Sequence, residues 1–233
     1  MPTDEEVIAG QAIYNRFVLA TYDVYVLGFS NRLIWRCPKR HMLDNYHRNT
    51  GGRHLELGPG TAYLLDHCRF PTAAPELTLV DLNPTVLRMS AARLARYRPE
   101  TVRADLLRPL PFDDTTLPPG SYDSVGLNFV LHCLPGNWAE KGAVLDNAVA
   151  ALRPGGRFFG STILSSGVKV TGAARRLMAV YNGKGIFHNT DDDLAGLRWQ
   201  LDTRFTDIQV TVRGNVALFE ATRPESGATL ATG

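Results

Sequence analysis

A glycine turn preceded by an acid is the first group of residues in this 233-residue chain whose types and spacing could do chemistry. It lies in the run His54-Leu55-Glu56-Leu57-Gly58-Pro59-Gly60-Thr61-Ala62, in which an apolar stretch ends in glycines and a helical pattern follows at once. Glycines let the backbone pass close to a ligand, and the amides at a helix start favour a negative group. The run predicts a ligand-binding turn, and a tight turn without a ligand is the alternative.

A second acid, Asp81, ends the next apolar run and lies about one βα unit after the glycine turn. From this position a carboxylate can accept hydrogen bonds from both hydroxyls of a ribose. A helix-capping role is also open to Asp81 or Asn83, because Pro84 suits the first position of a helix. Both roles can hold together, with Asp81 on the ligand and Asn83 as the cap.

Three further runs follow in sequence order. They are Arg103-Ala104-Asp105-Leu106-Leu107, then Tyr122-Asp123-Ser124-Val125 leading to Asn128-Phe129-Val130-Leu131-His132, and finally Leu152-Arg153-Pro154-Gly155-Gly156-Arg157. In order and spacing, all these runs together resemble the successive motifs of class I S-adenosylmethionine-dependent methyltransferases, over about residues 53 to 164. The resemblance implies S-adenosylmethionine as the cofactor and S-adenosylhomocysteine as the product.

The resemblance also implies a set of cofactor-binding residues in the motifs, namely Glu56, Gly58, Gly60, Thr61, Asp81, Leu82, Asp105, Leu106, Asn128 and Phe129. Within this set, the first acid and the glycines would surround the methionine part, and Asp81 would hold the ribose diol. Asp105 would meet the adenine amino group, with Leu82 and Leu106 against the ring. Many family members have a third glycine where this chain has Ala62, so we expect a slightly looser approach of helix to strand without loss of binding.

Two histidines are candidate general bases. His132 follows the fourth strand, near the place where substrate meets the methyl group in this fold, and a structural role is favoured for it. His188 precedes a helix in a region that could cover a substrate pocket, where it could also contact substrate or be an ordinary loop histidine.

Aromatic side chains are frequent near the N-terminus. Tyr14 and Tyr22 could contact the cofactor, whereas Tyr25 and Trp35 could contact an aromatic substrate. A cluster of aromatic core residues is the alternative to this prediction.

The elements that must position these residues follow from the hydrophobic periodicity. Residues 5 to about 49 show a helical pattern, with a new helix start after Pro38. Strands are then predicted at 53–57, 77–80, 101–104, 121–127, 157–163, 208–212 and 216–221, with helices at 61–68, 84–97, 137–152 and 190–205, the last capped by Thr190. Alternation of this kind predicts an α/β fold.

The expected architecture is a Rossmann-like three-layer sandwich with a mostly parallel seven-stranded sheet, an antiparallel C-terminal strand and an N-terminal helical lid. We expect residues 1–50 to form the lid segment, 51–224 the S-adenosylmethionine-binding domain and 225–233 a frayed tail.

Composition limits the possible partners. Lys and Arg number 25 against 23 Asp and Glu, and the bases are scattered along the sequence, which argues against nucleic acid. Three cysteines (Cys37, Cys68 and Cys133) lie far apart without a CxxC pair, which argues against a disulfide framework and a zinc site. An acidic N-terminus and the lack of a long apolar run predict a cytoplasmic enzyme without a membrane partner. The oligomeric state stays open.

The sequence therefore predicts transfer of a methyl group from S-adenosylmethionine to an oxygen, sulfur or nitrogen atom of a small molecule by in-line displacement. One alternative is a non-catalytic protein that binds S-adenosylmethionine or a nucleotide. The other is an NAD(P)-dependent oxidoreductase, but such sites favour G-x-G-x-x-G, and Thr61-Ala62-Tyr63 after Gly60 breaks that spacing.

Overall fold

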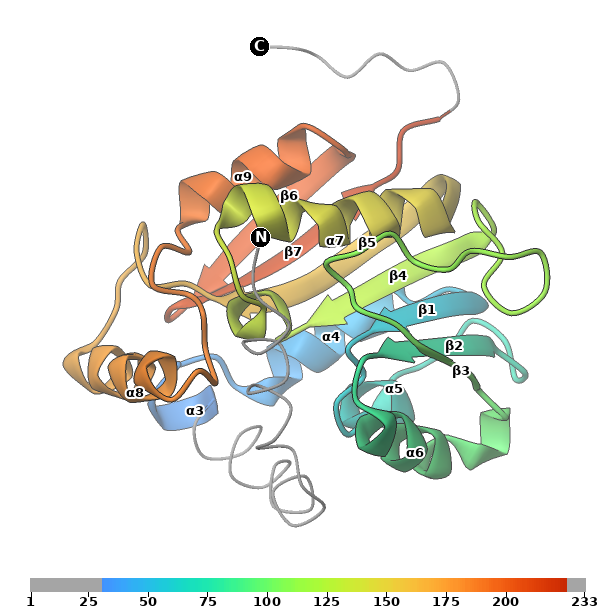
Figure 1. Ribbon diagram of the computed structural model, residues 1–233, viewed down its shortest axis with the longest axis horizontal. Coiled ribbons are helices and arrows are strands. Elements are labelled where there is room, and N and C mark those ends of the chain that lie inside the picture. Colours follow the sequence, from blue (N-terminus) through green and yellow to red (C-terminus); the bar gives the residue numbers. More distant parts are fainter. Residues whose placement is uncertain (1–30, 226–233) are drawn as a thin grey trace.

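Seven strands form a single sheet in the order β3-β2-β1-β4-β5-β7-β6 in a computed structural model of the chain, which describes residues 31–225 (Figure 1). The strands are β1 (Arg53–Leu57), β2 (Glu76–Asp81), β3 (Glu100–Arg103), β4 (Tyr122–Asn128), β5 (Leu152–Ile163), β6 (Thr206–Arg213) and β7 (Val216–Thr222). Strands β1 to β5 pair in parallel, and β7 pairs antiparallel with both β5 and β6. The predicted fold class is confirmed.

Helices cover both faces of this sheet. They are α3 (Asn31–Leu33), α4 (Lys39–Asn49), α5 (Tyr63–His67), α6 (Pro84–Arg93), α7 (Trp138–Ala151), α8 (Gly172–Gly183) and α9 (Leu194–Asp202), with the short 3-10 helices η2 (Ala95–Tyr97) and η3 (Leu131–Cys133). One core cluster joins the sheet to α7 and α9, and the other joins it to α4, α5, α6 and α8. Among residues 31–225, no helix is long and apolar enough to cross a membrane.

Local sequence signals explain most helix starts. Asn83 caps α6 by accepting a hydrogen bond from the Thr85 amide at 2.8 Å, and Pro84 occupies the first turn. Because Asn83 is the cap, the Asp81 side chain is not needed for that role. Asn137 and Glu140 form a capping box at the start of α7.

Two parts of the predicted secondary structure are wrong. The last helix begins at Leu194, and Asp193 caps it by accepting from the Gly196 amide at 2.8 Å, so Thr190 is not its cap. Thr190 instead lies in the segment before α9, where its backbone carbonyl accepts from the Ser165 hydroxyl. Helix α8 is absent from the prediction, because glycines stand at both of its ends and weaken the helical pattern.

The tip of the β6–β7 hairpin packs against the connection between α3 and α4. The Asn215 amide donates to the Trp35 carbonyl at 3.3 Å, and a side chain at Gly214 would meet Trp35 and Arg36. The hairpin at the C-terminal end of the sheet therefore contacts the segment at Trp35–Arg36, which precedes β1. Residues 1–30, on which the predicted lid mainly falls, and 226–233 lie outside the described residues.

Candidate functional site

The carboxyl ends of neighbouring parallel strands bring several predicted site residues to one edge of the sheet. Strand β1 lies between β2 and β4, so the glycine turn, Asp81 and Asn128 share that edge (Figure 1). The strand order reverses here, because the chain runs outward from β1 to β3 and then returns to β4 on the other side of β1. In open α/β sheets, this kind of crevice is where ligands bind.

The two glycines of the turn are needed for different reasons. Both have left-handed backbones, with φ of +68° at Gly58 and +53° at Gly60. A Cβ at Gly58 would lie 2.5 Å from a methyl carbon of Val130, so the turn packs closely on the end of β4. None of residues 31–225 lies within 4 Å of a Cβ built at Gly60, so the described part of the chain leaves room for a ligand to approach the backbone here.

Ala62 also has a left-handed backbone, with φ of +56°, and its side chain is buried. Thr61 beside it is buried as well. A residue with a Cβ is disfavoured in this conformation, which explains why a glycine would suit the position. The third glycine position of the motif is thus a strained alanine in this chain.

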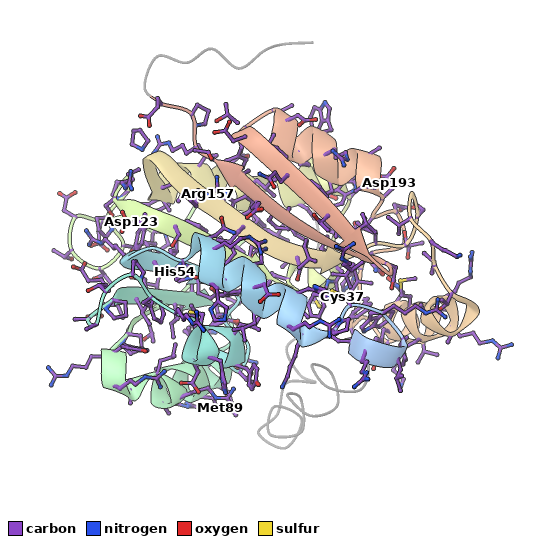
Figure 2. The ribbon with its side chains drawn as sticks, turned by 180° about the vertical axis from the view of Figure 1, so that it is seen from behind. Cys37, His54, Met89, Asp123, Arg157 and Asp193 are labelled. Atoms are coloured by element: carbon purple, nitrogen blue, oxygen red, sulfur yellow. The ribbon has the colours of Figure 1, made fainter. Side chains whose placement is uncertain are left out.

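Glu56 lies in a buried hydrogen-bond network that the sequence analysis did not predict. Its Oε1 accepts from the Tyr46 hydroxyl at 2.5 Å, and its Oε2 lies 2.9 Å from His54 Nε2. The other ring nitrogen of His54 lies 2.7 Å from the Ser124 hydroxyl, which itself accepts from the Gly51 amide. Figure 2 shows His54 beside α4. The network thus fixes the carboxylate between α4, β1 and β4.

One feature of the network could have been found in the sequence. His54 and Glu56 are two residues apart on a strand and therefore share a face of the sheet. Burial and the neighbouring Glu56 raise the pKa of the Tyr46 phenol well above its usual value, so the phenol keeps its proton and donates it. No signal in the sequence links Tyr46, on another element, to this face.

Asp81 is part-buried at the end of β2. Its Oδ1 accepts from the Asn83 amide at 2.7 Å. Burial raises the pKa of this carboxyl to about 6, and the Asn83 and Leu82 amides partly oppose that shift. Within the described part of the chain, no basic side chain forms an ion pair with Asp81. A carboxylate of this kind fits neutral hydroxyl donors such as a ribose diol.

The residues predicted to flank an adenine lie along the next loops. Asp105 Oδ1 accepts from the Leu107 amide at 2.9 Å, so this acid also shapes its own loop. Leu106 is buried, and its carbonyl accepts from the Asn147 side chain of α7. Leu82 is part-buried in the connection from β2 to α6. Their contact with a cofactor stays a prediction.

Strand β4 ends in a strained residue. Asn128 Oδ1 accepts from the Ser161 hydroxyl of β5 at 2.6 Å. Phe129 follows with φ of +58°, although it is bulky and buried. Its amide donates to the Ser161 carbonyl at 2.8 Å, which holds this conformation. Strained backbones of this type collect at functional sites.

His132 is buried behind this strand end. Its Nδ1 lies 3.3 Å from the Ile163 amide, and its ring packs edge-on against Phe187 with centroids 4.5 Å apart. Burial, together with the Lys141 charge, lowers the pKa of His132 to about 3, so the ring is neutral at pH 7. This environment favours the structural role, and a catalytic role stays a prediction.

His188 lies beside η3, with its amide donating to the His132 carbonyl at 2.8 Å. The structure thus brings the two candidate histidines to neighbouring positions. Trp35 is buried in the core, with its ring centroid 6.0 Å from that of Phe187, so its indole packs with the residue that precedes His188. Tyr14, Tyr22 and Tyr25 lie outside the described residues.

Comparisons with known proteins agree with this geometry. A protein-family model described as a methyltransferase domain matches residues 55–158. The chain is 45% identical over 218 residues to demethylluteothin O-methyltransferase from Streptomyces thioluteus, covering 94% of this chain and 93% of that protein. It is 37% identical over 219 residues to the physcion biosynthesis cluster O-methyltransferase from Aspergillus chevalieri, covering 93% and 96%.

Solved structures share the architecture at low sequence identity. The N-methyltransferase NodS from Bradyrhizobium japonicum, in complex with S-adenosyl-L-homocysteine, matches with a TM-score of 0.58 and 16% identity. The match covers 89% of this chain and 97% of that one. At this identity the likeness concerns the fold.

Proposed function

The chain belongs to the class I S-adenosylmethionine-dependent methyltransferases, and from this membership we propose that it methylates a hydroxyl oxygen of a small molecule. The observation that carries the proposal is the 45% identity, over nearly the whole length of both chains, to an enzyme named as an O-methyltransferase. A second relative named as an O-methyltransferase, at 37% identity, supports the same acceptor atom.

The residues at the sheet edge fit the cofactor. When bound, S-adenosylmethionine supplies a methyl group made electrophilic by the sulfonium. Among the described residues, the space beside Gly60 admits a ligand close to the backbone, and the Asp81 carboxylate has no ion-pair partner there and suits the ribose hydroxyls. We assign the methionine part to the turn at Gly58–Gly60 and Glu56, and the adenine to the loops at Leu82 and Asp105–Leu106. Asn128 and Phe129 would close the pocket from β4.

The protein must also align and deprotonate the acceptor. Holding the acceptor oxygen in line with the methyl carbon contributes roughly 7–11 kcal/mol in favourable intramolecular systems. An alcohol or phenol benefits from a base, which contributes about 10²–10⁴-fold. His132 is buried with a pKa of about 3, so it is a poor proton acceptor at neutral pH. We therefore favour His188 over His132 as the group that receives the hydroxyl proton.

We further propose that the enzyme works in the cytoplasm and uses neither nucleic acid nor a membrane as a partner. The nearly balanced charge of the whole chain supports this proposal. In this proposal, residues 51–224 form the cofactor-binding domain, and the segment before it covers the site.

A methyl-transfer screen tests the function. The full chain is incubated with S-adenosylmethionine carrying a labelled methyl group and with matched sets of phenols, enols, alcohols, amines and thiols. We expect S-adenosylhomocysteine release together with a labelled methyl ether, located on oxygen by mass spectrometry of the product. Transfer only to amines or thiols would contradict the acceptor assignment. A folded sample that does not bind S-adenosylmethionine in calorimetry would contradict the cofactor site itself.

A further inference from the structure

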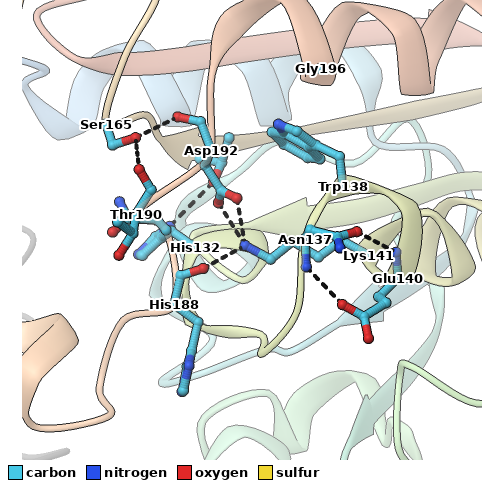
Figure 3. Close-up of polar contacts among 12 residues, drawn as sticks. His132, Asn137, Trp138, Glu140, Lys141, Ser165, His188, Thr190, Asp192 and Gly196 are labelled. Carbon is cyan, nitrogen blue, oxygen red and sulfur yellow. Dashed lines mark hydrogen bonds and ion pairs between the residues drawn. The ribbon is translucent and has the colours of Figure 1, made fainter. Parts of the chain in front are cut away.

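A buried ion pair lies beside η3, outside the set of predicted cofactor residues. The side chains of Lys141 on α7 and Asp192 have exposed fractions of 0% and 2%. Lys141 Nζ lies 2.6 Å from Asp192 Oδ1, 2.8 Å from Oδ2 and 2.9 Å from the His188 carbonyl oxygen (Figure 3). An ammonium group has three protons, so the carboxylate and the carbonyl together use its donors.

The ion pair holds the segment from His188 to Asp192, and backbone hydrogen bonds hold the same segment. The His188 amide donates to the His132 carbonyl in η3 at 2.8 Å. The Asp192 carbonyl accepts from the Ser165 amide at 2.8 Å and from the Ser165 hydroxyl at 3.0 Å. Phe187, which precedes the segment, packs its ring against His132. These contacts fix the main chain of His188 relative to the end of β4.

Stability alone does not explain the burial of two charges here. Moving each ion out of water costs several kcal/mol, and well-packed apolar side chains often stabilise a fold equally well. The ammonium of Lys141, however, holds a main-chain oxygen that an apolar side chain would not bind. Figure 3 shows the His188 imidazole pointing away from Lys141 and Asp192. The pair therefore fixes the residue that carries the imidazole without contacting the ring.

We propose that Lys141 is a positioning residue for methyl transfer and that it acts through His188. This inference rests on the proposed function, since it requires an acceptor hydroxyl near His188. By binding the His188 carbonyl, Lys141 keeps the imidazole directed at the acceptor. As the acceptor oxygen bonds to the methyl carbon and the carbon–sulfur bond breaks, the hydroxyl proton passes to an imidazole nitrogen. The product ether and the neutral thioether then leave.

A mutant cycle on the full chain separates positioning from folding. The variant Lys141→Met/Asp192→Leu replaces the ion pair with apolar side chains, so no buried charge is left unpaired. It is measured with His188 present and in the His188→Ala background. Lys169→Met, at an exposed lysine before α8, is the matched control. Readouts are kcat and KM for an acceptor found in the screen, S-adenosylmethionine affinity by calorimetry, and circular dichroism.

With His188 present, we expect the apolar variant to lower kcat by about tenfold or more, a part of the usual effect of a base. In the His188→Ala background the same change is expected to alter kcat by less than about twofold, because the group to be positioned is gone. Cofactor affinity and the fold should match those of the Lys169→Met control. Equal losses of kcat in both backgrounds, or no loss in a folded variant, would overturn the inference. A wild-type chain that methylates nothing would instead refute the proposed function.

Discussion

The two polar regions around the site, the strand-end region at Glu56 and Asp81 and the loop region at His188 and Asp192, are held in different ways. In the strand-end region, Glu56 is held by the Tyr46 hydroxyl and the His54 ring, and the strands themselves set the positions of both acids. In the loop region, no strand contains the segment, and a charged pair ties it to α7.

This difference separates two tasks within one site. Every family member must bind the same cofactor, and strand ends offer a fixed geometry for that purpose. The acceptor differs between enzymes, and loops tolerate change more readily than strands do. A loop that carries a functional side chain then needs contacts that fix its backbone. Here Lys141 and Ser165 supply hydrogen bonds to the carbonyls of His188 and Asp192.

The largest effect is expected on stability at the ion pair. Lys141→Ala leaves the Asp192 carboxylate buried without its cation, which typically costs about 3–5 kcal/mol of unfolding free energy. Urea unfolding measures the loss, with Lys169→Ala as the exposed control. The paired apolar variant should recover most of it. A single variant as stable as the control would mean that the pair contributes nothing to holding the loop.

The next effect concerns cofactor binding at the strand ends. Asp81→Ala removes a carboxylate that would accept two ribose hydroxyls, and a hydrogen bond to a charged group contributes about 1.5–3 kcal/mol. We expect S-adenosylmethionine affinity to fall by roughly 100-fold in calorimetry, with the melting temperature nearly unchanged. Asp191→Ala, at an exposed acid in the loop region, serves as the control. Equal affinity in a folded Asp81 variant would remove Asp81 from the site.

A smaller effect is expected within the Glu56 network. Tyr46→Phe deletes one hydrogen bond to a buried carboxylate and keeps the ring, so we expect a loss of about 2 kcal/mol in unfolding free energy. Because His54 still holds the other oxygen, cofactor affinity should fall less than in the Asp81 variant. Tyr97→Phe is a matched control whose hydroxyl is not part of this network. A Tyr46 variant as stable as the control would contradict the structural role of the contact.

The smallest expected effect is a dependence of S-adenosylmethionine affinity on pH, caused by Asp81. Its pKa in the free protein is about 6, above the ordinary value of 3.8, and the ribose hydroxyls bind the ionised form. Affinity for S-adenosylmethionine should therefore be constant above pH 7 and about tenfold weaker at pH 5. The same raised pKa affects folding in the opposite direction. Because the folded protein holds this proton more tightly than the unfolded chain, the free energy of unfolding falls as pH rises from 3.8 through 6. An Asp81→Asn variant should lose the pH dependence of affinity, and its persistence would assign it to another group.

The strand-end region was largely predictable from the sequence, whereas the loop region was not. A glycine turn after an apolar strand and an acid at the next strand end are local patterns, and both lie at the predicted positions. The Tyr46–Glu56 contact joins different elements, and no local pattern encodes it. Lys141, at the end of the first turn of α7, would be expected at the surface from its type, yet it is buried, and its partner is 51 residues away in the sequence.

The contact between Trp35 and the β6–β7 hairpin has a consequence for how the protein is made. Synthesis proceeds from the N-terminus, so Trp35 leaves the ribosome long before Asn215 exists to bind its carbonyl. The segment around Trp35 therefore cannot form this native contact until the β6–β7 hairpin has been synthesised. A nascent chain that ends before β7 lacks the hydrogen bond to the Trp35 carbonyl, so this segment reaches its final position only late in synthesis.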